Sequence, residues 1–256
     1  MPFSAEQILA AMTLWAAPFL RLSAMMLIAP IFSAAGFSVR TRVLLAVLVA
    51  ALLAPVLPSP PVTDLFSANG LLMAIREVGV GFTIGFVLQI AFGAVVFAGQ
   101  AVAMTMGLGF AMAVDPQSGV QVPTVSQFNV ILTTLLFLAI DGHLALLVAV
   151  AESYQIVPAA ISGIPVSSLG GVAALGSKVF AAGILLALPA LTALLLVNVS
   201  FGVMTRAAPQ LNIFAVGFPL TIFAGLIVMY LAMPGFIAGI REVLEGSLEQ
   251  TLTIFG

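Results

Sequence analysis

Ionisable residues that could do chemistry inside an apolar setting are few in this chain. Asp141-Gly142-His143 lies within an apolar run, and a carboxylate beside an imidazole in a membrane is the pattern of a proton relay. The same residues also fit a helix kink at the membrane edge, with Asp141 capping a new turn. We favour the kink and leave the relay open.

Arg21 is a second intramembrane polar candidate, in the interior of the first apolar stretch between Pro18 and Pro30. A central arginine costs about 2.5–3.5 kcal/mol on insertion scales, so it should face protein or water. Its charge either snorkels toward the membrane surface or pairs with a neighbouring helix, and both interpretations stay open.

The ionisable residues do not assemble into a recognisable catalytic or metal site. One histidine, no cysteine and scattered carboxylates do not supply a metal centre of the usual ligand count. No serine pairs recognisably with a base. We therefore expect no catalytic residue, no metal ion and no cofactor. The formal net charge of −2 also argues against a nucleic-acid partner, which would call for a basic face.

The composition indicates an all-α integral membrane protein. Of its 256 residues, 62% are hydrophobic and only 6% are charged, with a mean hydropathy of +1.29. Soluble domains are nearer a quarter charged. Six apolar stretches approach or exceed the roughly 20 residues that span a bilayer. They are about 8–32, 41–57, 71–98, 127–150, 178–203 and 213–237. The second is short and the third long, so neither need be an ordinary perpendicular span. We expect about six long, kinked helices. We expect one membrane domain over residues 1–256, with helices arranged as hairpins.

A glycine stripe in the third stretch predicts close helix packing. Gly81, Gly85, Gln89 and Gly93 follow one another at four-residue intervals and so share one helix face. Small residues let the backbones of membrane helices approach closely.

The segment from Gly107 to Asn129 breaks the apolar pattern. It contains Gly107, Gly109, Asp115-Pro116, Gly119 and Pro123, residue types that disfavour a helix interior. In hydrocarbon, irregular backbone is tolerated only when it is buried in protein or lines a watery cavity. The segment is therefore either a loop outside the bilayer or part of a channel.

Two features are expected near the C-terminal end. A short polar connection at 204–212 predicts a tight helical hairpin. Beyond Pro234, the apolar residues Ile237, Ile240, Leu244 and Leu248 recur at three- and four-residue spacing. This pattern predicts an amphipathic helix on a membrane interface or a partner.

Four blocks of this sequence resemble the FliR family, the flagellar biosynthetic membrane proteins of the type III export gate; the injectisome relatives are more distant. The blocks are Arg21 to Pro30 with Arg40, Arg42 and Pro55; Gly107 to Asn129; Asp141 to Pro158; and Arg206 to Phe214 with Gly217 and Pro219. The likeness covers nearly the whole chain, and the fourth block is the most specific.

The resemblance implies a pore built with FliP and FliQ in the bacterial inner membrane, with part of the assembly toward the periplasm. It also implies that residues 1–158 are FliP-like helices carrying a plug loop at 107–126. Residues 159–256 would then be a FliQ-like hairpin followed by the amphipathic C-terminal helix. FlhB would contact the cytoplasmic hairpin tip, and unfolded flagellar export substrates would pass through the pore. The implied tip residues are Arg206, Pro209, Gln210 and Asn212.

A plug at this position is physically reasonable. A channel for unfolded polypeptide must stay closed to ions while idle, and apolar constrictions close by dewetting. Methionines are adaptable apolar groups suited to such a seal, which we favour over the alternative that they merely fill packing gaps. The candidate plug residues are Met106, Gly107, Leu108, Gly109, Phe110, Met112, Asp115 and Pro116.

Two alternatives remain beside this reading. A stand-alone secondary transporter would use Asp115, Asp141 and His143 at a midplane site, although the two halves of the chain show no matching interrupted helices. The injectisome counterpart of the same gate would have the same physics and different cargo.

Overall fold

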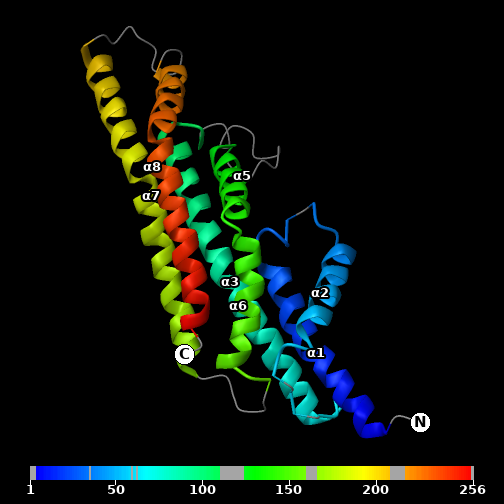
Figure 1. Cartoon of the computed structure of the whole chain (residues 1–256). Coiled ribbons are helices and arrows are strands. Elements are labelled where there is room, and N and C mark those ends of the chain that lie inside the picture. The colour runs from blue at the N-terminus through cyan, green and yellow to red at the C-terminus, as the bar shows by residue number, and fades with distance from the viewer. Residues whose placement is uncertain are drawn as a thin grey trace. The chain divides into compact units, whose positions relative to one another are not determined.

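The structure is a computed structural model that describes residues 4–34, 36–58, 60–61, 63–109, 124–159, 166–207 and 217–254. All regular structure in these ranges is helical (Figure 1). The helices are α1 (Ala5–Ile28), α2 (Val39–Leu53), α3 (Ala68–Thr105), α5 (Thr124–Ala139), α6 (Gly142–Ile156), α7 (Val166–Ala207) and α8 (Phe218–Thr253). The all-α prediction is therefore confirmed for the described part of the chain.

Not every one of the six apolar stretches corresponds to a helix long enough to cross a membrane. Within the described ranges, four qualify by length and composition, and a fifth does if α5 and α6 are taken as one bent span. The second stretch was expected to be short, and α2, which covers most of 41–57, has 15 residues. At 1.5 Å per residue it is about 22 Å long, short of the roughly 30 Å hydrocarbon core. The apolar spans nevertheless make this a membrane protein.

Serine side chains start the first two helices. The Ser4 hydroxyl accepts a hydrogen bond from the Gln7 amide (3.2 Å), and the Gln7 side chain accepts one from the Ser4 amide (3.0 Å), which completes a capping box. Ser38 accepts from the Thr41 amide at the start of α2. These local bonds satisfy backbone donors that have no partner within the helix.

Pro234 does not end a helix, although the sequence suggested a separate tail after it. α8 continues through Pro234 to Thr253. The amphipathic tail is therefore continuous with the apolar helix before it.

A kink separates α5 from α6. The two helices are bent by 66° at a break of a few residues. Asp141 lies in the break with φ 55° and ψ 25°, a left-handed conformation that aspartate adopts more readily than most residues. Its side chain makes no capping hydrogen bond, contrary to the expectation that it caps the new turn. Its carbonyl instead accepts from the amides of Leu144 and Ala145 at 2.9 and 3.0 Å.

The chain forms two compact units that interleave along the sequence. The first contains residues 1–90, 138–176 and 245–256, and the second contains 91–137 and 177–244. α3 contributes its first part to one unit and its last part to the other. The predicted division at residue 158 concerns likeness to FliP and FliQ, which these units do not test, and it stays a prediction.

Close approach of α1 and α3 shapes the first unit. A Cβ atom at Gly81 would overlap the Arg21 carbonyl oxygen, and one at Gly85 would lie 2.7 Å from the Met25 carbonyl oxygen. The two glycines therefore let the α3 backbone lie directly against α1. Of the other stripe residues, Gln89 is exposed and Gly93 is half-buried.

In the second unit, α3 packs between α5 and α7. A Cβ atom at Gly99 would lie 2.6 Å from the Ser126 Cα of α5, and one at Gly183 of α7 would lie 2.9 Å from the Ala94 carbonyl oxygen. α7 and α8 run side by side (Figure 1), and a Cβ atom at Gly239 would lie 2.7 Å from the Leu186 side chain. These contacts hold the end of α3 in place.

Candidate functional site

The broken segment begins where α3 ends in a glycine-dependent stop. Gly107 has φ +85°, a left-handed conformation that glycine adopts without strain. The Gly107 amide donates to the Met104 carbonyl, and the Leu108 amide donates to the Ala103 carbonyl, each at 3.0 Å. This pair of bonds is the Schellman motif, which ends a helix and turns the chain away from its axis. The glycine at 107 thus ends the apolar helix at the point where the predicted plug begins.

Side chains from two other helices satisfy the last carbonyls of α3. The Asn198 amide of α7 donates to the Thr105 carbonyl at 3.1 Å. The Thr221 hydroxyl of α8 lies 3.3 Å from the Met106 carbonyl and 2.9 Å from the Phe218 carbonyl of its own helix. Because a hydroxyl has one hydrogen, Thr221 shares it between two acceptors. The end of α3 is therefore held by α7 and, more weakly, by α8.

Apolar packing fixes the same helix end. Met106 is fully buried, and a Cβ atom at Gly225 of α8 would lie 2.5 Å from its terminal methyl carbon. A Cβ atom at Gly107 would lie 3.3 Å from the ring of Phe218. The missing side chains at both glycines therefore let α8 fit against the turn.

The remaining predicted plug residues are only partly described. Leu108 and Gly109 are half-buried. A Cβ atom at Gly109 would lie 2.5 Å from the sulfur of Met104. Phe110, Met112, Asp115 and Pro116 lie outside the described residues, so the course of the segment stays a prediction.

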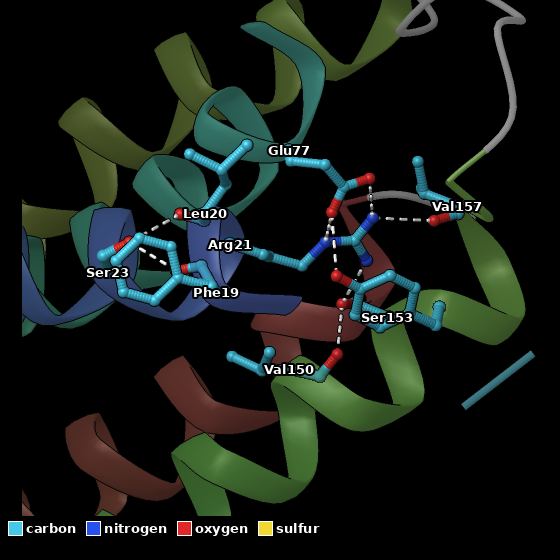
Figure 2. A network of polar contacts seen from close by, with 9 residues as sticks. Phe19, Leu20, Arg21, Ser23, Glu77, Val150, Ser153 and Val157 are labelled. Carbon is cyan, nitrogen blue, oxygen red and sulfur yellow. Dashed lines mark hydrogen bonds and ion pairs between the residues drawn. The ribbon is translucent and has the colours of Figure 1, made fainter. Parts of the chain in front are cut away.

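A second polar site lies buried in the first unit, around Arg21 (Figure 2). The side chains of Arg21 and Glu77 are 0% exposed and form an ion pair between α1 and α3. Arg21 Nε and Nη2 donate to the two Glu77 carboxylate oxygens at 2.8 and 2.9 Å. Arg21 also donates to the Ser153 hydroxyl (2.8 Å) and the Val157 carbonyl (3.0 Å), at the end of α6. One guanidinium group thus joins three helices.

Tyr154 completes this cluster. Its hydroxyl donates to a Glu77 carboxylate oxygen at 2.8 Å. The guanidinium carbon of Arg21 lies over the Tyr154 ring, 3.6 Å from the ring centroid, which is a cation–π contact. The Ser153 hydroxyl passes its own hydrogen to the Val150 carbonyl at 2.6 Å. The charges are therefore paired and hydrogen-bonded, which is the condition for burying them.

This geometry resolves the two interpretations of Arg21 in favour of pairing with neighbouring helices. A bidentate arginine–carboxylate contact is directional and short, so it fixes helix register as well as balancing charge. Because its charges are paired and hydrogen-bonded to one another, the cluster is suited to a structural role. It can hold α1, α3 and α6 together in an apolar medium.

Asp141 and His143 do not form a metal site with other described residues. Asp141 is exposed, and His143 is half-buried with Nδ1 lacking a hydrogen-bond partner in the described part of the chain. No group of three or more possible metal ligands occurs within the described ranges.

At the predicted hairpin tip, Arg206 is exposed at the end of α7, and Pro209, Gln210 and Asn212 lie outside the described residues.

Sequence reasoning missed the partners in both sites. Glu77 is an acid in an apolar stretch, and its partner could have been sought in Arg21, since intramembrane charges tend to pair. Asn198 is the amide residue in the run LLLVNVSF, which is a signal for a helix-to-helix hydrogen bond. Neither signal identifies the backbone carbonyl that receives the bond.

Comparison with known proteins places these sites in a family. The model of "Bacterial export proteins, family 1" matches residues 12–247, a range that contains both sites. The flagellar biosynthetic protein FliR of Pectobacterium carotovorum subsp. carotovorum is 38% identical over 217 residues, covering 85% of this chain and 83% of that protein. FliR of Escherichia coli (strain K12) is also 38% identical, over 233 residues covering 90% of this chain and 88% of that protein.

The chain belongs to the FliR family. More divergent relatives agree, since FliR of Bacillus subtilis (strain 168) is 28% identical over 235 residues, or 90% of each chain. Membership of the FliR family makes the chain a membrane-embedded component of flagellar protein export. The names of the relatives refer to flagellar biosynthesis and not to a catalysed reaction.

Proposed function

We propose that the chain is a structural and gating subunit of the flagellar protein export channel. It forms a pore with FliP and FliQ in the bacterial inner membrane, with part of the assembly toward the periplasm. Its segment 107–126 acts as a plug that closes the pore while no substrate passes. The observation that carries the proposal is the glycine stop at Gly107, inside a chain that belongs to an export family.

The way α3 ends supports a plug rather than a random break. A helix that merely frays leaves its last carbonyls to water. Here each of the carbonyls from Val102 to Met106 has a hydrogen-bond partner, in the backbone or in Asn198 and Thr221. A chain that leaves a fully satisfied helix end starts from a fixed position and direction. That suits a segment that must return to one place after each substrate.

The seal itself is proposed to be apolar. Met106 and Leu108 begin the segment, and further apolar residues follow in the sequence FAMAV. Narrow apolar constrictions exclude water and ions without any covalent or charged barrier. Flexible methionine side chains can close around different contents, and the glycines let the segment fold back.

The partners follow from the same proposal. Unfolded flagellar export substrates pass through the pore, and FlhB contacts the tip formed by Arg206, Pro209, Gln210 and Asn212. The exposure of Arg206 at the end of α7 leaves its charge available for such a contact. The FliR relatives favour flagellar over injectisome cargo, and membership of an export family argues against a stand-alone transporter.

Deleting Gly107 to Gly119 tests the plug. The variant and the unaltered chain are each assembled with the other gate subunits, purified and reconstituted in liposomes, and ion leak is measured at equal amounts of complex. The proposal expects a large rise in leak with the deletion. An ion barrier as tight as that of the unaltered complex, in a fully assembled variant, would defeat the plug assignment.

A further inference from the structure

Two side chains, Asn198 of α7 and Thr221 of α8, attach these helices to the end of α3. Among the described contacts, these are the only hydrogen bonds that either side chain makes to another helix. Asn198 donates to the Thr105 carbonyl at 3.1 Å, and Thr221 reaches the Met106 carbonyl at 3.3 Å. Both bonds join residues about a hundred positions apart in sequence, so they are tertiary contacts and not local caps. We infer that Asn198 and Thr221 form a latch that holds the plug in its closed position by its root.

This inference rests on the proposed function, and it assigns the residues that position the plug. The carbonyls of Val102, Ala103 and Met104 accept from the backbone of the turn itself. Those of Thr105 and Met106 depend on the two side chains. Both contacts are part-buried, and a carbonyl that loses its donor away from bulk water is disfavoured. The root of the plug therefore stays against α7 and α8 unless another donor replaces the latch.

The two halves of the latch differ in strength. Asn198 is half-buried, and its side-chain amide donates a hydrogen bond to the Thr105 carbonyl of α3. Thr221 shares its hydroxyl hydrogen with the nearer Phe218 carbonyl, so it keeps a partner if α3 moves away. Release thus leaves Thr221 satisfied and requires mainly the loss of the Asn198 bond. This difference in strength suits a latch that must open repeatedly.

The two latch residues also lie near the ends of α7 and α8 that flank residues 208–216 in the sequence. Asn198 lies eight residues before Arg206, which is about 12 Å along a helix. Thr221 lies in the first turn of α8, which begins at Phe218. A partner that shifts the tip would therefore move both donors relative to the end of α3. Contact at the tip and the state of the plug are coupled by this arrangement.

Variants in the intact export assembly test the latch. Asn198→Leu removes the amide at similar volume, and Thr221→Val removes the hydroxyl, whereas Thr221→Ser keeps it. Thr192→Val is the matched control, because the exposed Thr192 hydroxyl bonds only the Leu188 carbonyl of its own helix among the described contacts. Ion leak of reconstituted complexes is measured for each variant, beside the deletion of 107–119.

A second readout follows the plug root directly. The chain has no cysteine, so Leu108→Cys gives it a single reporter site. The rate at which a membrane-impermeant maleimide labels this chain reports how often the root is displaced. The same four substitutions are introduced into the reporter chain, and the amount of complex recovered is recorded for each.

The latch predicts a graded result. A neutral hydrogen bond shifts an equilibrium by roughly fivefold, so Asn198→Leu should raise both leak and labelling by about that factor. Thr221→Val should have a smaller effect, about twofold, because its hydrogen is shared. Thr221→Ser and Thr192→Val should match the unaltered complex. If Asn198→Leu does not assemble, the comparison of Thr221→Val with Thr221→Ser decides.

The outcomes separate the latch from the proposed function. Leak after the 107–119 deletion, with no change in Asn198→Leu or Thr221→Val, overturns the latch and leaves the plug. No leak in any variant overturns both. Leak that rises equally in Thr221→Ser and Thr221→Val, with Thr192→Val unchanged, means that packing, and not hydrogen bonding, holds the root, which also overturns the latch.

Discussion

Removing one partner of the buried Arg21–Glu77 pair should destabilise the protein far more than removing both. Glu77→Gln keeps the shape of the side chain and deletes its charge, so it leaves the Arg21 charge uncompensated at 0% exposure. Arg21 donates two hydrogen bonds to that carboxylate. Bonds to charged groups contribute about 1.5–3 kcal/mol each. The sum, about 3–6 kcal/mol, agrees with the roughly 3–5 kcal/mol typical of breaking a buried pair.

A double-mutant cycle gives the sharpest form of this prediction. Glu77→Leu and Arg21→Met are each compared with the double variant Arg21→Met/Glu77→Leu, which leaves no unpaired charge at this pair. We expect the double variant to be more stable than either single one, with an interaction energy above about 2 kcal/mol. The assay is equilibrium unfolding of the purified export assembly in mixed detergent, followed by protection of this chain from protease. Gly246→Ala serves as a control, since a Cβ atom there meets nothing within 4 Å.

Two results would refute this reasoning. Single variants within about 1 kcal/mol of the unaltered protein would mean that water or lipid headgroups already solvate the pair. A double variant whose destabilisation equals the sum of the two single ones would mean that Arg21 and Glu77 act independently.

Four further substitutions test the packing, the stop and the tip. Gly81→Ala should destabilise the protein by about 1–3 kcal/mol, because the new Cβ overlaps the α1 backbone. The control Gly246→Ala should be neutral or stabilise the protein by up to about 1 kcal/mol. Thermal unfolding of the two variants measures the difference. Tyr154→Phe should cost about 1.5–3 kcal/mol in the same assay through the lost bond to a carboxylate. Gly107→Ala places a Cβ at φ +85° and should cost about 1–2 kcal/mol and raise ion leak; unchanged leak and stability would argue against the stop. Arg206→Glu should reduce swimming and partner capture while leaving unfolding unchanged, and normal swimming would count against the contact.

The sequence predicts the helices better than it predicts what they touch. Low charge and long apolar stretches are enough to specify membrane helices, because hydrocarbon requires backbone groups to be paired within each element. The proline- and glycine-rich composition after Thr105 likewise marks the end of α3. The number of membrane spans was harder to predict. An apolar stretch such as 41–57 does not show where its helix ends, and the helix there has only 15 residues.

Tertiary partners could not be derived from one sequence. Arg21 and Ser153 are 132 positions apart, and Asn198 and Thr105 are 93 apart, so no local spacing relates them. The Arg21–Glu77 pair is the contact that the sequence comes closest to predicting, because a charged residue in an apolar stretch needs a partner. Every residue carries a backbone carbonyl, so residue type does not identify the acceptor that Asn198 contacts.

Electron microscopy of the purified assembly is the most direct test of the central claim. We expect this chain to be one member of a tube of several subunits, with residues 107–126 crossing the lumen and Asn198 beside the end of α3. A solitary chain in detergent, with those residues surrounded by bulk solvent and far from any conduit, would contradict it.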